Sequence, residues 1–228
     1  MKIIATIQSD FWEKFGIPRQ SGLVEELEAR IIFEPEYRNP AAVRGLDGFS
    51  HIWLIWQFSE SLREGWSPTV RPPRLGGNER MGVFATRSPF RPNEIGLSCV
   101  KIVKIEQTKE FGPVITVSGA DLLNGTPIYD IKPYIPHVDS KPEAKAGFSA
   151  ENKQYQLEVK IPESELEKIP VEKREALKGI LAEDPRPAYQ EDSQREYGLN
   201  FAGYEVHFSV KNKTLYVSNI DKRLRNGD

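Results

Sequence analysis

Short runs of β-branched and aromatic residues recur along the first part of the chain, and glycine, proline, asparagine and aspartate separate them. Runs of this length and composition are typical of β-strands, whereas longer segments with apolar positions every three to four residues favour helices. Only a brief helical pattern intervenes, at residues 40–44, so the runs predict a closed or nearly closed β-barrel. The expected strands lie at residues 3–7, 29–33, 52–58, 81–86, 97–105, 114–118 and 128–131.

The pattern changes at about residue 141, where glutamate and lysine become frequent. Leucine and isoleucine recur at helical spacing between residues 164 and 181. Ser164 is the expected N-cap, since Glu167 follows three residues later, and Pro170 is expected to divide the segment into two short helices.

The residues 204–210 and 214–220 then predict a β-hairpin joined by the turn KNK. The fold class expected for the whole chain is therefore mainly β. It comprises an N-terminal β-barrel of residues 1–140 and a small α+β C-terminal domain of residues 141–228.

Composition narrows the class of protein. The chain has 228 residues, a formal net charge of −2 and 39% hydrophobic residues, as expected for a soluble globular protein. The N-terminus lacks the pattern of a signal peptide, and the most apolar run, at 52–58, is too short to span a membrane. Cys99 is the single cysteine, which excludes an internal disulfide and predicts a cytoplasmic protein with a buried structural thiol.

Charge is unevenly distributed along the chain. Residues 71–93 contain five arginines and no lysine, and Glu79 is the only acidic residue among them. The planar guanidinium pairs with carboxylates and phosphates through two hydrogen bonds, and the prolines and glycines of this run stiffen the loop. The run therefore predicts placed contacts to an anionic ligand, although a solvated loop with surface ion pairs is the alternative.

Several familiar site signatures are missing from the sequence. It contains neither the glycine fingerprint of dinucleotide-binding folds, nor a phosphate-binding loop, nor the nucleophile elbow of the α/β-hydrolases. One cysteine and three widely separated histidines make a zinc site improbable, so no metal is expected. From the residues alone, the prediction is an anion-binding β-barrel.

Six blocks of the sequence resemble one family closely and in the expected order along about the whole chain. They are PRQ at 18–20, DGFSHIWLIW at 47–56, RPPRLGG at 71–77, GVFATRSPFRPNEIGLS at 82–98, DLLNGTPIYDIKPYIPHVDS at 121–140 and DPRPAY at 184–189. The family is that of the tRNA threonylcarbamoyladenosine methyltransferases. The resemblance implies a homodimeric β-barrel enzyme that uses S-adenosylmethionine to methylate the base nitrogen of threonylcarbamoyladenosine beside the tRNA anticodon.

The resemblance also implies site residues. Those expected to bind the cofactor are Pro18, Arg19, Gln20, His51, Ile52, Arg87, Leu97, Asp121, Leu122, Leu123, Asn124, Gly125 and Thr126. Those expected to contact the anticodon loop of the tRNA are Arg91, Asn93, Tyr134, Arg186 and Tyr189.

The catalytic group follows from the chemistry of the acceptor nitrogen. Its lone pair is delocalised into a urea-like carbonyl, so a base that removes its proton and a cation that polarises the carbonyl would both help. Asp130, His137 and Asp139 are the candidates for the base, and Lys132 is the candidate for the cation. The residues do not decide among the three bases.

Two other classes of function remain open from the sequence. A non-catalytic RNA-binding barrel would use the same arginine run without binding S-adenosylmethionine. A barrel hydrolase or transferase would act on a small anionic substrate without requiring tRNA.

Overall fold

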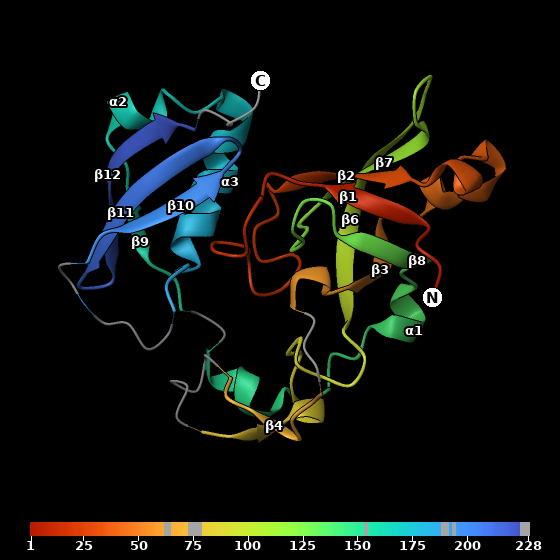
Figure 1. Cartoon of the computed structure of the whole chain (residues 1–228), viewed down its shortest axis with the longest axis horizontal. Helices are drawn as coiled ribbons and strands as arrows, with labels where there is room; N and C mark the ends of the chain where they lie inside the picture. Colours follow the sequence, from red (N-terminus) through yellow and green to blue (C-terminus); the bar gives the residue numbers. More distant parts are fainter. Residues whose placement is uncertain (62–64, 73–78, 153–154, 188–191, 193–194, 224–228) are drawn as a thin grey trace.

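The computed structural model describes residues 1–61, 65–72, 79–152, 155–187, 192 and 195–223. Its N-terminal half is a closed barrel of six antiparallel strands in the order β1-β2-β7-β6-β3-β8 (Figure 1). The mainly β fold expected from the sequence is thereby confirmed. The strands are β1 (Ala5–Gln8), β2 (Glu28–Phe33), β3 (His51–Gln57), β6 (Ile95–Thr108), β7 (Gly112–Ser118) and β8 (Pro127–Pro133).

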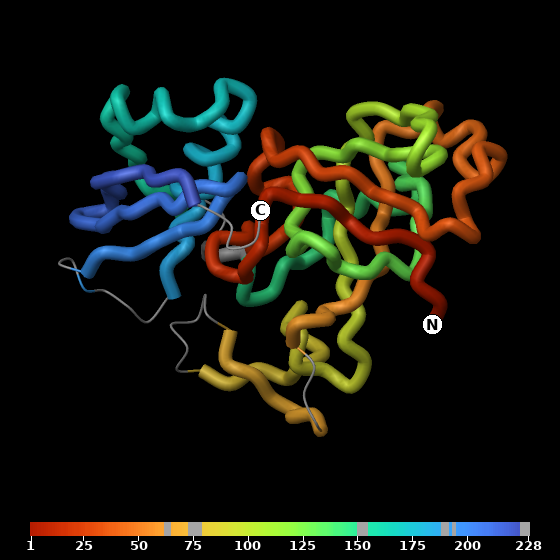
Figure 2. Tube along the Cα trace, turned by 45° about the horizontal axis from the view of Figure 1, so that its top comes forward, coloured from red at the N-terminus to blue at the C-terminus, as the bar shows by residue number. Residues whose placement is uncertain are grey.

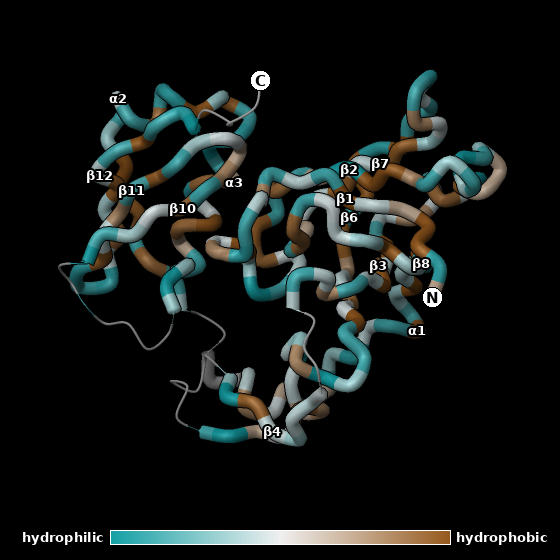
Figure 3. The backbone as a smooth tube through the Cα atoms, viewed as in Figure 1, coloured by the Kyte–Doolittle hydropathy of each residue, from teal (hydrophilic) through white to brown (hydrophobic). Residues whose placement is uncertain are grey.

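Alternating side chains fill the barrel. Along β3, Ile52 and Leu54 are fully buried in the core, whereas Trp53 and Ile55 point outward and are half-buried. Figure 3 shows the same concentration of hydrophobic residues along the strands of both sheets. Gly96 of β6 lies directly against the indole of Trp56, because an added Cβ would come within 2.3 Å of that ring.

The alternation of strand direction brings three connections to one end of the barrel, which we call the loop end. They are residues 9–27 between β1 and β2, residues 58–94 between β3 and β6, and residues 119–126 between β7 and β8. Because neighbouring strands are antiparallel, the β2–β3 connection and the β6–β7 hairpin lie at the opposite end.

The predicted strand at 81–86 is wrong. Only Met81–Gly82 (β5) is extended, pairing with Thr69–Val70 (β4), and a 3₁₀ turn at Val83–Ala85 follows. Within this stretch only Val83 is buried, so its apolar residues do not form one face of a barrel strand. The described part of residues 65–93 instead forms an extension that projects from the loop end, below the barrel in Figures 1 and 2.

The C-terminal half is a second sheet of order β10-β11-β12-β9 packed on helix α3. The predicted hairpin is confirmed: β11 and β12 pair antiparallel around Asn212 and Lys213, whose φ angles of 52° and 62° make a tight turn. The elements are β9 (Glu158–Lys160), α2 (Glu163–Leu166), α3 (Val171–Ala182), β10 (Tyr197–Phe201), β11 (Tyr204–Lys211) and β12 (Thr214–Lys222).

The prediction of two short helices separated by Pro170 is confirmed, since Pro170 is the N-cap residue of α3. The predicted N-cap at Ser164 is wrong, because Pro162 occupies that position and Ser164 lies inside α2. Pro162 has no side-chain hydrogen bond to offer, and the helix is instead fastened by its own carboxylate at Glu165.

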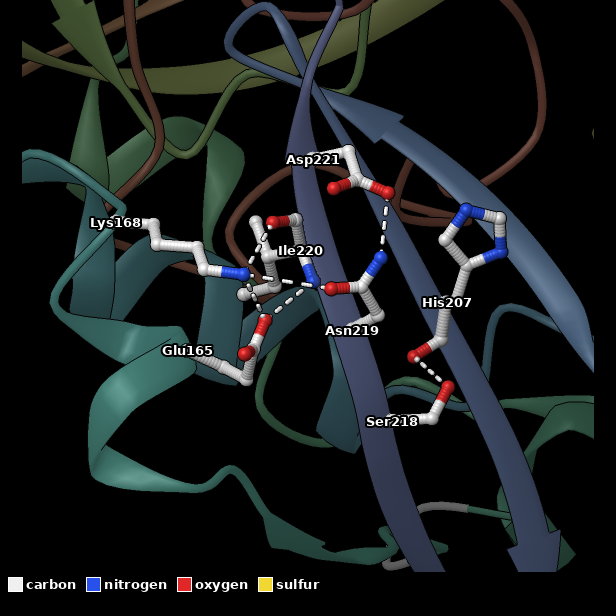
Figure 4. Close-up of polar contacts among 7 residues, drawn as sticks. All are labelled: Glu165, Lys168, His207, Ser218, Asn219, Ile220 and Asp221. Atoms are coloured by element: carbon white, nitrogen blue, oxygen red, sulfur yellow. Dashed lines mark hydrogen bonds and ion pairs between the residues drawn. The ribbon is translucent and has the colours of Figure 1, made fainter.

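Helix α2 is held to β12 by the polar contacts drawn in Figure 4. The Ile220 N–H donates to Oε2 of Glu165 at 2.6 Å, and Nζ of Lys168 donates to the same oxygen at 2.7 Å. Lys168 also donates to the Ile220 carbonyl at 3.0 Å. These bonds satisfy backbone groups on the side of β12 where the pairing with β9 has ended.

The remaining helical segments are short. They are η1 (Pro35–Tyr37), η2 (Pro40–Val43), η3 (Leu46–Gly48), η4 (Ser59–Ser61), α1 (Pro136–Asp139) and η7 (Gly147–Asn152). The helical pattern expected at 40–44 is confirmed by η2. Among the described residues, no helix is long and apolar enough to cross a membrane.

Residues 9–27 leave the barrel and complete the hydrophobic core of the C-terminal half (Figure 2). Phe11 is 1% exposed and its ring centroid lies 5.7 Å from that of Phe201. Nζ of Lys173 on α3 contacts Oδ2 of Asp10 at 2.5 Å, so an ion pair supports the same junction. The core of the C-terminal half therefore includes residues of the N-terminal half, so the two halves do not touch only through their surfaces.

We expect Phe11→Ala to lower the free energy of unfolding by about 3 to 5 kcal/mol, because it removes a buried ring and leaves a cavity. The effect is to be measured by urea unfolding, followed by far-ultraviolet circular dichroism. Phe84→Ala is the matched control, since Phe84 is 72% exposed and should lose little stability. Equal losses in the two variants would contradict the shared core.

Candidate functional site

Four segments converge at the loop end through the side chains of Gln20, Arg87, Ser98 and Asp121, which we call the Arg87 cluster. The Arg87 guanidinium donates to Oε1 of Gln20. Oγ of Ser98 donates to Oδ1 of Asp121 at 2.6 Å and accepts from Nε1 of Trp56 at 2.9 Å. The positive charge of Arg87 also acts on Asp121, so three of the residues expected at the cofactor site, Gln20, Arg87 and Asp121, lie close together.

Burial raises the pKa of Asp121 above its ordinary value. It outweighs the hydrogen bonds from Ser98 and from the backbone of Asp121 and Ser21, and the nearby positive charge of Arg87, all of which favour the ionised form. Asp121 is thus a carboxyl group whose ionised form is disfavoured by burial, beside an exposed guanidinium that suits a carboxylate.

The rest of the DLLNGT segment fastens the loop to the barrel. Oδ1 of Asn124 accepts from the Ser9 N–H at 3.1 Å, and the Gly125 N–H donates to the Ile7 carbonyl at 2.8 Å. Oγ1 of Thr126 donates to the Leu123 carbonyl at 2.7 Å. Leu122 is buried in the barrel core, and Leu123 packs on the C-terminal core. Of the expected residues 121–126, Asp121 is the one whose side chain joins the Arg87 cluster.

Pro18 and Arg19 face the C-terminal half. They line a cavity of about 210 Å³ together with Phe15, Ile17, Ile180 and the segment 184–187. The Arg19 guanidinium donates to the Arg186 carbonyl at 3.4 Å. The PRQ segment is thus held between the C-terminal half on one side and Arg87 on the other.

Arg186, expected to contact tRNA, is engaged inside the protein. Its guanidinium makes two hydrogen bonds of 2.8 Å to the carboxylate of Asp184, and its side chain is 12% exposed. Burial would raise the pKa of Asp184, but the hydrogen bonds and charge of Arg186 hold it below its ordinary value. Tyr155 donates to the same carboxylate at 3.1 Å. Tyr189 lies outside the described residues.

A second group lies where β3 begins and β8 ends. The ring of Tyr134 is 6.2 Å from that of His51 and 5.8 Å from that of Trp53, centroid to centroid. Oδ2 of Asp139 accepts from the Ile135 N–H at 2.8 Å and from Nε1 of Trp53 at 3.2 Å. These bonds lower the pKa of Asp139, so its carboxylate is a weaker base than an ordinary aspartate.

Cys99 lies between the two groups. Its N–H donates to Oγ of Ser21 at 3.1 Å, and it is paired across the sheet with Trp53. Burial, together with the negative charge of Asp139, raises the pKa of the thiol, so Cys99 is a poor nucleophile. The thiol is half-buried rather than fully buried as expected. The two groups therefore border one outward face of the barrel.

We call this outward surface of β6, β3 and β8 the open face. Leu97 is 52% exposed on it, whereas the Ile52 side chain points away from it into the barrel core. Nζ of Lys132 contacts Oδ2 of Asp130 at 2.9 Å, and these residues pair with the outward-facing Trp53 and Ile55 of β3.

The remaining expected residues surround this region. Arg91 is half-buried and donates to the Thr86 carbonyl at 3.1 Å, whereas Asn93 is exposed. His137 is exposed on α1. Among the described residues, no group of three or more histidine, cysteine, aspartate or glutamate side chains could hold a metal ion.

The sequence interpretation missed three residues of the site, Ser21, Trp53 and Ser98. Ser98 carried a signal: it is a polar residue at an inward position of β6, 1% exposed, and such a group requires a partner. Trp53 carried the converse signal, because it is a large aromatic residue at an outward position of β3. Ser21 had none, because its partner is a backbone N–H brought to it by tertiary structure.

Comparison with known proteins identifies relatives of the chain. The tRNA-methyltransferase O N-terminal domain matches residues 6–140, and the TrmO C-terminal domain matches residues 142–223. The tRNA (adenine(37)-N6)-methyltransferase of Escherichia coli K12 is 39% identical over 96% of this chain and 97% of its own length. The enzyme of that name from Eikenella corrodens is 48% identical over 72% of this chain and 92% of its own length.

A crystal structure of TrmO from Pseudomonas aeruginosa superimposes with a TM-score of 0.77 and 32% identity. The match covers 96% of this chain and 95% of that one. The family resemblance stated from the sequence is confirmed by these matches.

We expect Asp139→Asn to lower the free energy of unfolding at pH 7, because the hydrogen bonds from Ile135 and Trp53 favour the carboxylate. Since the pKa of Asp139 is lower folded than unfolded, its contribution is complete above the unfolded value and is lost as pH falls through the folded value. The difference between variant and wild type should therefore shrink below about pH 4.

Urea unfolding of both proteins between pH 7 and pH 2.5 measures this difference. Asp130→Asn, which removes an exposed ion pair, is the control and should lose less stability at pH 7. A stability difference that did not change with pH would contradict the role of the ionised Asp139.

Proposed function

The chain belongs to the tRNA-methyltransferase O family, and on that premise we propose that it methylates N6 of threonylcarbamoyladenosine at tRNA position 37, using S-adenosylmethionine. The observation that carries the proposal is the succession of two family domains along nearly the whole chain, together with a relative matched over 97% of its length. A non-catalytic RNA-binding barrel, or a hydrolase for a small anion, has no comparable support.

The Arg87 cluster and the open face fit the parts of the cofactor. The exposed guanidinium of Arg87 suits its carboxylate, the half-buried carboxyl of Asp121 suits a ribose hydroxyl or the amino group, and exposed Leu97 suits the adenine ring. When bound, S-adenosylmethionine supplies an electrophilic methyl group on a sulfonium. The His51 and Tyr134 rings border the same open face. The chain would contribute binding and alignment, which supply much of the acceleration of a displacement reaction.

The acceptor nitrogen requires help from the chain. We assign the base to Asp130 and the polarising cation to Lys132, because the two are paired at 2.9 Å and lie beside the open face. The N6 proton would pass to the Asp130 carboxylate as the new N–C bond forms, while Lys132 would stabilise negative charge on the urea carbonyl. Asp139 is the weaker candidate, because the hydrogen bonds from Ile135 and Trp53 lower its pKa and make it a weaker base. His137 remains the alternative base.

The open face supports the proposal of a homodimer. Leu97 and Ile95 are 52% and 36% exposed at adjacent outward positions of β6, and an apolar surface of this kind is commonly covered by a partner. A second copy placed there would enclose the cofactor site on the side that one chain leaves open. We further propose a cytoplasmic protein in which residues 1–140 form the catalytic domain and residues 141–228 an accessory domain.

Incubation of purified protein with S-adenosylmethionine and tRNA carrying threonylcarbamoyladenosine should add one methyl group to that nucleoside. Mass analysis of digested tRNA measures the product. Transcripts with unmodified adenosine at position 37 are the control and should stay unmethylated. Asp130→Asn should lower kcat at saturating cofactor about 100-fold, as loss of a general base does, while leaving the cofactor Kd unchanged.

Methylation of unmodified transcripts would contradict the proposed substrate. Salt-sensitive tRNA binding without any affinity for S-adenosylmethionine in calorimetry would favour the RNA-binding barrel.

Ile95→Glu should dissociate the proposed dimer and lower methyl transfer by at least tenfold, because it places a charge in an apolar contact outside the residues assigned to the cofactor. Sedimentation velocity gives the oligomeric state, and the nucleoside assay gives the activity. Val103→Glu is the matched control, since Val103 lies on the same strand and is 45% exposed. Wild-type protein that stays fully active per subunit when diluted to monomers would refute the dimeric site.

A further inference from the structure

Two large aromatic side chains of the extension stand outside the hydrophobic cores. Trp66 is 54% exposed and Phe84 is 72% exposed. Their ring centroids are 6.2 Å apart and their planes are inclined by 30°. The two rings thus lie beside one another near the surface. Each has exposed surface on which a further planar group could pack.

The backbone of the extension fixes this pair. Thr69 pairs with Gly82 in the β4–β5 ladder, and the Val83 N–H donates to the Pro68 carbonyl at 2.9 Å. The Val83 side chain is 1% exposed and anchors the same turn. The two rings are therefore brought together by the chain segments that carry them, without being buried themselves.

The charge around the pair is positive. Residues 65–93 contain five arginines, no lysine and a single acidic residue. Arg71 directly follows β4 and Arg80 directly precedes β5; both are exposed, and Arg80 donates to Oγ1 of Thr69 at 2.8 Å. Exposed aromatic rings in an arginine-rich segment match single-stranded nucleic acid, in which bases stack on rings and phosphates pair with arginine.

The Trp66–Phe84 pair also lies within reach of the Arg87 cluster. Arg87 is three positions after Phe84, so their Cα atoms are at most about 11 Å apart along an extended chain. Arg87 in turn donates to Gln20 at the proposed cofactor site. A base stacked on Phe84 would therefore be close to a nucleotide held at that site.

We propose that Trp66 and Phe84 form a stacking platform for an unpaired anticodon-loop base that neighbours the methylated adenosine. The proposal rests on the proposed function and adds to it the residues that hold the loop. It assigns RNA, rather than a protein surface, to these rings.

The test compares Trp66→Ala and Phe84→Ala with Trp66→Phe, which keeps an aromatic ring. Trp12→Ala is the matched control, since Trp12 is also 54% exposed but lies outside the extension. Fluorescence anisotropy of a labelled anticodon stem-loop carrying threonylcarbamoyladenosine gives the RNA Kd, with S-adenosylhomocysteine present. Calorimetry gives the Kd for S-adenosylmethionine, and sedimentation velocity gives the oligomeric state.

We expect each alanine variant to raise the RNA Kd about tenfold, as loss of one base–aromatic stack does, while Trp66→Phe and Trp12→Ala change it less than about threefold. The Kd for S-adenosylmethionine and the oligomeric state should not change. An unchanged RNA Kd in Trp66→Ala and Phe84→Ala would overturn the proposal. Dissociation of a dimer by Trp66→Ala would overturn it in favour of a contact between subunits.

The two proposals fail separately. If wild-type protein bound the stem-loop without methylating it, and the alanine variants lost that binding, the proposed reaction would be refuted and the stacking platform would be supported. If wild-type protein methylated the RNA and both alanine variants bound it normally, the proposed reaction would be supported and the stacking platform would be refuted.

Discussion

Closure of a six-stranded antiparallel barrel is the constraint on which the rest of the structure depends. Once the strands close in the order β1-β2-β7-β6-β3-β8, the connections 9–27, 58–94 and 119–126 must leave from the same end. Gln20, Arg87 and Asp121 each come from a different one of these connections. The Arg87 cluster is thus a product of topology, and the strands beneath it supply Ser98 and Trp56 as its rigid base.

The described part of the C-terminal half fixes the position of the 9–27 connection. Its hydrophobic core includes Phe11, Val24 and Leu27, so both ends of the 9–27 connection are fixed. Between these ends, Arg19 donates a hydrogen bond to the Arg186 carbonyl. Arg186 itself is held by Asp184. The extension has a different design, because the rings of Trp66 and Phe84 remain exposed and Arg71 and Arg80 face solvent.

Much of this architecture could be predicted from the sequence, and the exceptions have physical causes. Six barrel strands and the C-terminal hairpin follow from local runs of β-branched and aromatic residues. The strand expected at 81–86 fails because a strand also needs a neighbour, and only Met81–Gly82 has one. The helix start at Ser164 fails because capping was assigned from residue type, whereas the bond to Ile220 holds the helix from a distant strand. The engagement of Arg186 and Asp139 could not be predicted, since their partners depend on tertiary packing.

The contact between Phe11 and Phe201 also has a consequence for synthesis on the ribosome. Phe201 of β10 is synthesised long after Phe11. Strand β12, which completes the sheet behind Phe201, is synthesised later still. Since chains fold as they are extended from the N-terminus, the barrel can close early, but its 9–27 connection must wait for its permanent neighbours until α3 and β10 to β12 have been synthesised. During that interval the nascent chain exposes the apolar side chains of Phe11, Val24 and Leu27.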